Sequence, residues 1–141
     1  MLNRTRVALL GIGALALGCD AFPKFQLQLQ QEIQREFHIT NAMVMVVDST
    51  YMVVAIFDDK HSAFEQTELA AFKEQVAHYA VTHYHRSKLR TLGVMVGRAT
   101  RRGSDRDPEA TLFVPEYHPD GTVRLAMMPP QRERTKAIKK E

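Results

Sequence analysis

Two short segments, residues 42–47 and 51–57, limit most strongly what this chain can fold into. They read AMVMVV and YMVVAIF, and the polar tripeptide DST at 48–50 separates them. Runs of β-branched and other apolar residues on either side of a short polar break predict a β-hairpin. Because successive side chains of a strand point to opposite faces, both faces of this hairpin are apolar. Both faces must therefore be covered, by helices or by another surface.

Two other segments have the apolar period of amphipathic helices. In residues 22–37 the apolar side chains recur at four-residue spacing on a polar background, and Pro23 suits the first turn of a helix. A second helix is expected to end at about Tyr84. It begins at Ser62, whose spacing from Glu65 is that of a capping box, or at Thr67. The apolar positions are Phe25, Leu29, Ile33 and Phe37 in the first helix, and Phe64, Leu69, Phe72, Val76, Tyr79 and Ala80 in the second.

Three more strands are expected at residues 89–96, 111–117 and 122–127, the last two joined by the turn sequence HPDG. The prediction is an α+β fold: a mixed four- or five-stranded sheet with two helices, in the order α-β-β-α-β-β-β. The long helix packs on one face of the sheet. The first helix either covers the other face or lies beside the long helix. In the second arrangement the surface around Met43 and Met45 stays open and needs a partner.

The first 18 residues differ in chemistry from the rest of the chain. Arg4 and Arg6 precede an uninterrupted apolar run, residues 7–17, and Gly18 follows it directly. A charged start, an apolar core and a small residue are the order of a secretory signal. The run is much shorter than the roughly 20 residues that a membrane-spanning helix needs. We therefore predict a signal peptide over residues 1–18, a single α/β domain over 19–128 and a disordered charged tail over 129–141.

Cys19, the single cysteine of the chain, stands directly after this leader in the sequence LALGCD. The segment resembles the signal peptide of a bacterial lipoprotein, with small or aliphatic residues before the cysteine, although Ala16 stands where that pattern prefers leucine. The resemblance implies that Cys19 carries fatty-acyl chains and becomes the mature N-terminus. It also implies that Asp20 acts as a sorting signal that retains such proteins at the inner membrane of enterobacteria. The alternatives are an ordinary secreted protein cut near Gly18 and a retained N-terminal helix with a core cysteine.

The charge balance of the chain does not favour a nucleic-acid partner. The full chain has 19 basic and 16 acidic residues, but Arg4 and Arg6 belong to the leader, so the mature chain is close to neutral. Nucleic-acid binding depends on a clear excess of positive charge. We therefore expect no nucleic-acid partner. The membrane, reached through the lipid anchor, is the expected partner, together with an envelope protein.

No combination of residues predicts catalysis. No serine lies in a nucleophile elbow, no glycine pattern matches a phosphate-binding loop, and the adjacent carboxylates of Asp58 and Asp59 point apart in an extended chain. His78 and His83 are five residues apart, whereas metal ligands on a helix are usually three or four apart. We therefore expect no enzyme activity, no cofactor and no metal. A basic cluster that can contact an anion or a partner is formed by Arg98, Arg101, Arg102 and Arg106.

These expectations combine into one functional hypothesis. The chain is predicted to be a lipid-anchored protein of the cell membrane, facing the periplasm or the exterior, whose domain is a non-catalytic interaction or accessory module of the envelope. The alternative is an envelope lipoprotein that binds a small ligand or a metal through the cluster of His78, His83 and His85 or through the arginine cluster.

Overall fold

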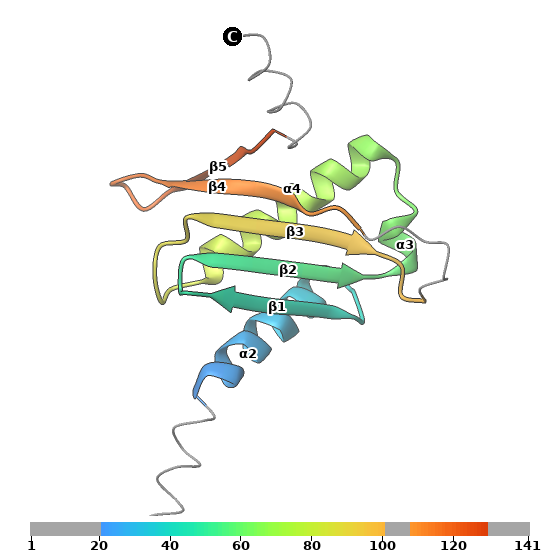
Figure 1. The fold of residues 1–141 in the computed structure, drawn as a ribbon, viewed down its shortest axis with the longest axis horizontal. Helices are drawn as coiled ribbons and strands as arrows, with labels where there is room; N and C mark the ends of the chain where they lie inside the picture. The colour runs from blue at the N-terminus through green and yellow to red at the C-terminus, as the bar shows by residue number, and fades with distance from the viewer. Residues whose placement is uncertain (1–20, 101–107, 130–141) are drawn as a thin grey trace, which may run out of the picture.

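A computed structural model of the protein describes residues 21–100 and 108–129. Its centre is a five-stranded sheet with the strands in the order β1-β2-β3-β4-β5 (Figure 1). The middle pair, β2 and β3, is parallel, and the other neighbours are antiparallel. The α+β class and the mixed sheet predicted from the sequence are thereby confirmed. The strands are β1 (Ala42–Val47), β2 (Tyr51–Phe57), β3 (Thr91–Gly97), β4 (Thr111–Tyr117) and β5 (Val123–Met127).

In the described part of the chain, three helices accompany the sheet: α2 (Ala21–Glu36), the single-turn α3 (Asp59–Ser62) and α4 (Gln66–His83). Together, α3 and α4 connect the parallel strands β2 and β3, which need such a long crossover. Figure 1 shows that α2 and α4 both lie behind the sheet as drawn, on one and the same face. Of the two arrangements that the sequence left open, the first helix therefore lies beside the long helix.

The core lies between this helical layer and the sheet. Leu29 and Ile33 of α2 and Val76 and Ala80 of α4 are buried there, as their periodicity predicted. Every second residue of the strands packs against these helix residues. On that side the buried strand residues are Ala42, Val44, Met52, Val54, Ile56, Leu92, Val94, Val96 and Phe113.

The β1–β2 hairpin is antiparallel and is closed by a short turn. Ala42 pairs with Ile56 and Val47 with Tyr51, and the N–H of Thr50 donates to the carbonyl of Val47 at 3.3 Å. Asp48 and Ser49 both have positive φ angles, of 53° and 58°. Two such residues in succession give the turn the twist that matches paired strands.

The connection after β2 differs from the sequence prediction. Ser62 does not begin the long helix: it ends α3, and its hydroxyl donates to the carbonyl of Asp59 at 3.1 Å. Asp58 begins α3 instead, because its carboxylate accepts a hydrogen bond from the N–H of His61 at 3.0 Å. The long helix α4 then starts at Gln66. Within residues 21–100 and 108–129, no helix is both long and apolar enough to cross a bilayer.

Candidate functional site

The face of the sheet opposite the helices is a continuous apolar surface among the described residues. Because side chains alternate along a strand, every second residue points into the core and the residues between them point to this face. On the edge strand β1, the side chains of Met43, Met45 and Val47 are 48%, 47% and 44% exposed. We call this surface the open face. It consists of Met43, Met45 and Val47 of β1, Tyr51, Val53, Ala55 and Phe57 of β2, Thr91, Gly93, Met95 and Gly97 of β3, Leu112 and Val114 of β4, and Ala126 of β5.

Two glycines of β3 make the centre of the open face flat. A Cβ atom on Gly93 would lie 3.3 Å from Leu112 Cδ2 and 3.4 Å from the hydroxyl oxygen of Tyr51. A Cβ atom on Gly97 would lie 3.2 Å from Cγ of Pro108. Neighbouring side chains therefore lean across the positions that have no side chain of their own. The central strands are thus partly covered by the chain itself, whereas β1 presents its side chains openly.

The open face carries almost no charge. None of its positions in β1, β2 or β3 is a charged residue. The charges that share this face, Glu116 and Arg124, stand opposite each other at the far end of β4 and β5. In β1, β2 and β3 its polar side-chain atoms are the hydroxyls of Tyr51 and Thr91. An apolar surface of this kind gains free energy when another apolar surface covers it. The arrangement therefore suits association.

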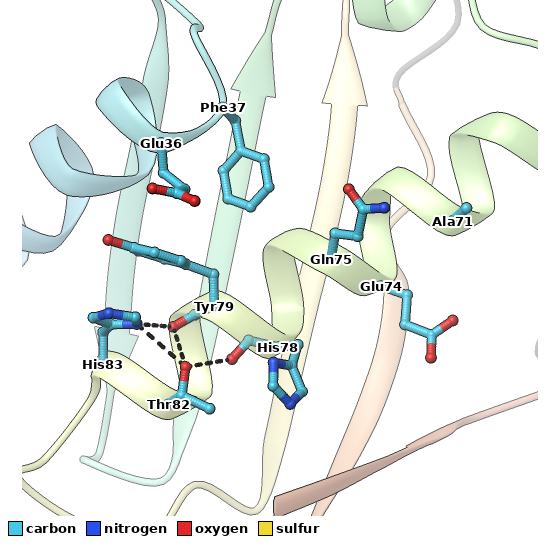
Figure 2. A pocket seen from close by; sticks show the side chains of 9 residues that line it. All are labelled: Glu36, Phe37, Ala71, Glu74, Gln75, His78, Tyr79, Thr82 and His83. Carbon is cyan, nitrogen blue, oxygen red and sulfur yellow. Dashed lines mark hydrogen bonds between the residues drawn. The ribbon is translucent and has the colours of Figure 1, made fainter.

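A second feature is a wide groove of about 900 Å³ between the end of α2 and the outer side of α4. Figure 2 shows that Glu36 and Phe37 face Tyr79 across it. The imidazole of His83 stacks on the ring of Tyr79, with centroids 3.8 Å apart, and its Nδ1 donates to the carbonyl oxygen of Tyr79 at 2.8 Å. The groove is lined by Glu36, Phe37, Ala71, Glu74, Gln75, His78, Tyr79, Thr82 and His83.

The groove is acidic and aromatic rather than a metal centre. Burial raises the pKa of the Tyr79 hydroxyl, and the negative charges of Glu32 and Glu36 raise it further. The rings of His78 and His83 point in different directions (Figure 2), which is the consequence of their five-residue spacing on one helix. Across the described part of the chain, no three His, Cys, Asp or Glu side chains are placed to hold a metal ion.

The adjacent carboxylates of Asp58 and Asp59 serve local structure. Asp58 binds both the backbone N–H and the imidazole Nδ1 of His61, whereas Asp59 accepts a hydrogen bond from the N–H of Ala99 at 3.1 Å. Burial alone would raise the pKa of Asp58, but the hydrogen bonds and charge of His61, with the charge of Lys60, hold that pKa below its ordinary value. The two carboxylates point to different partners and do not form an acid–base pair.

The structure places one of the site residues expected from the sequence. Arg98 is exposed and follows the end of β3 directly. Cys19, Asp20, Arg101, Arg102 and Arg106 lie outside the described residues, as do residues 1–18 and 130–141.

Sequence reasoning missed the groove, because Glu36 and Phe37, at the end of α2, are far in sequence from Tyr79 and His83 of α4. The one local signal was the four-residue spacing of Tyr79 and His83, which places both on one side of α4. Comparison with known proteins finds no matching family model, no similar curated protein and no similar solved structure.

Proposed function

We propose that the protein is a bacterial lipoprotein, anchored to the cell membrane through Cys19 and facing the periplasm or the exterior, whose domain is a non-catalytic interaction module. The observation that carries the module's role is the open face. A sheet with apolar residues on both sides has only one side covered by helices, and a large exposed apolar patch on a small domain marks a surface for association.

The sequence of the N-terminus supports the anchor. In the proposed mature protein, Asp20 alone separates the lipidated Cys19 from the first residue of α2, Ala21. A tether this short holds the domain against the bilayer. Several acyl chains, each gaining about 0.8 kcal/mol per buried CH₂ group, anchor a protein far more firmly than one chain does.

The anchor is tested by replacing Cys19→Ala and fractionating cells that have been fed a labelled fatty acid. The wild-type chain is expected in the membrane fraction with the label attached, and the variant is expected to be soluble and unlabelled. Asp20→Ser is the matched control, because it keeps the acceptor thiol and should keep the label. A wild-type chain that is unlabelled and still has residues 1–18 would refute this part of the proposal.

The groove supports a second candidate function, the binding of a small cationic ligand. The carboxylates of Glu36 and Glu74 and the ring of Tyr79 line it together, and a cation gains free energy beside both kinds of group. Thermal unfolding with and without zinc, and with and without a small quaternary ammonium ion, tests this candidate. A rise in Tm that Glu36→Gln abolishes would support it, and an unchanged Tm in all cases would remove it.

A further inference from the structure

We propose that the open face packs against the same face of a second copy of this chain, giving a two-fold dimer of face-to-face sheets. This inference rests on the proposed function, because the membrane anchor decides between two possible dimers below. It goes further in naming the partner of the open face.

The chain's own remaining segments are too polar to cover the open face. Residues 101–107 read RRGSDRD and residues 130–141 read PQRERTKAIKKE. Apart from the proline at 130, Ala137 and Ile138 are the only apolar residues in these two segments. The apolar run at residues 7–17 belongs to the proposed leader and leaves with it. Since neither segment offers an apolar cover, we assign the cover to another molecule.

The size of the open face approaches what a stable interface requires. Five strands spaced about 4.8 Å apart, each with about six residues that rise about 3.3 Å each, give a footprint of roughly 500 Å². The accessible area of protruding side chains exceeds this footprint. A standard interface buries about 800 Å² per partner. Two flat sheets also pack well on each other, since aligned sheets stack about 10 Å apart with interdigitating side chains.

The composition of the open face suits a second copy. An interface with two-fold symmetry brings like residues together, which is unfavourable for charges and favourable for apolar side chains. The β1–β3 part of the face is free of charge, and its most exposed members include the flexible Met43 and Met45, which adapt their shape to an opposing surface.

The anchor favours packing through the face over pairing of the β1 edges. Figure 1 shows that α2 begins beyond the β1 edge of the sheet, and Cys19 precedes the first residue of α2 by two positions in the sequence. The proposal therefore takes the membrane to lie at that edge. A two-fold axis perpendicular to the sheet would pair the two β1 strands but would send the two anchors in opposite directions. An axis that lies between the stacked sheets and runs across the strands keeps both β1 edges, and both anchors, at one membrane.

The first test is the mass of the full-length lipidated protein in detergent, measured by light scattering during size exclusion. The wild type is expected to be a dimer. Met45→Glu places a charge at the middle of the covered part of β1 and should weaken dimerisation at least about tenfold. Leu27→Glu is the matched control, because Leu27 is 49% exposed but lies on α2, in the opposite layer. Circular dichroism checks that both variants fold, which their exposed positions favour.

The second test is thiol cross-linking in isolated membranes with a bis-maleimide that spans the roughly 10 Å between stacked sheets, since that separation is too large for a direct disulfide. Met45→Cys should give a cross-linked dimer, whereas Leu27→Cys and the wild type, whose Cys19 is acylated, should not. A wild type that is monomeric in detergent and Met45→Cys that does not cross-link would overturn the inference. If such a protein still fractionates with membranes through Cys19, the proposed anchor stands while the dimer fails. Two other results would also refute the dimer, because each shows a different occupant of the open face. One is that Met45→Glu releases a different protein from a complex with this chain. The other is that the Cys19→Ala variant still binds anionic vesicles through the open face.

Discussion

At the end of β2, a single carboxylate determines how the chain turns into α3. Asp58 caps the helix through the N–H of His61, and the imidazole of His61, buried against the ring of Phe72 at a centroid distance of 4.3 Å, contacts the same carboxylate. The side chain therefore joins a backbone cap to the aromatic part of the core. The contacts with His61 are among the causes that lower the pKa of Asp58.

We expect Asp58→Ala to lower the free energy of unfolding at pH 7 by about 1 kcal/mol, the usual value of a helix cap. Because the pKa of Asp58 is lower in the folded state, its contribution is present above the unfolded value of 3.8 and disappears as the pH falls through the folded pKa. Urea unfolding of the variant and the wild type at several pH values tests this. The two curves should converge in acid, and Asp58→Asn, which keeps a capping oxygen, should lose less. A difference that stays constant with pH would show that the charge of Asp58 is irrelevant.

At a second residue, Lys73, folding disfavours the charged form of the side chain instead of favouring it. Its ammonium group leaves α4 to donate to the carbonyl of Glu109 at 3.3 Å and to the hydroxyl of Thr111 at 3.1 Å. Burial lowers the pKa of Lys73 although the charge of Glu109 opposes the shift. Between the folded pKa and the unfolded value of 10.5, the unfolded chain binds more protons, so the free energy of unfolding rises with pH there.

Lys73→Met should remove this rise. Titrating the stability from pH 7 towards pH 10 should show the wild type gaining on the variant, while Lys24→Met, at an exposed position of α2, should follow the wild type. The raised pKa of Tyr117 affects all three chains equally and cancels in the comparison. Parallel curves for the wild type and Lys73→Met would contradict the prediction.

At the scale of elements, α2 is a structural part of the domain. Ile33 and Leu29 are 0% and 2% exposed, and Phe37, directly after the helix, meets Tyr79 edge to face. We expect Ile33→Ala to cost about 2–5 kcal/mol of unfolding free energy, the range for large-to-small changes in a core. Leu27→Ala, on the same helix but half exposed, should change stability by less than about 0.5 kcal/mol. Equal, small effects in urea unfolding would mean that α2 packs only loosely on the sheet.

The sequence was sufficient to locate the elements, but not to arrange them. The strands at 42–47, 51–57 and 111–117 were predicted with their observed bounds, because β-branched runs between polar turns are a local signal. The side of the sheet on which α2 lies could not be predicted. The apolar stripe of α2 determines which side of the helix is buried. It does not determine which face of the sheet the helix packs on, because both faces of β1 and β2 are apolar. The turn α3 was missed because four residues are too few to show a period.

At the scale of the whole molecule, the candidate site could be predicted only in part, because the sequence does not determine how the elements are arranged. The Met43 and Met45 surface was anticipated as one of two outcomes, and only the placement of α2 beside α4 selected it. The groove required the end of α2 to meet the outer side of α4, a juxtaposition of segments far apart in the chain. The anchor, by contrast, is a local signal at Cys19 and remains a prediction from the sequence.

The covering of the open face can be measured on the whole molecule through its methionines. Met43 and Met45 are about half exposed on the open face, Met127 is 53% exposed, and Met52 is fully buried. Met127 pairs in register with Phe113 and therefore lies on the other side of the sheet. Mild peroxide oxidises accessible methionine to the sulfoxide, so each residue reports its own exposure.

In membranes from cells that make the wild-type protein, we expect peptide mass spectrometry to find Met127 oxidised first, Met52 unmodified, and Met43 and Met45 protected several-fold relative to Met127. In the Met45→Glu variant, Met43 should lose its protection and react about as fast as Met127, because the opposing apolar surface has left. Met127 and Met52 serve as internal standards for reagent access and for folding. Rapid oxidation of Met43 and Met45 in the wild type would show that the open face is bare at the membrane. The exposed side chains of β1 would then have no partner to account for them.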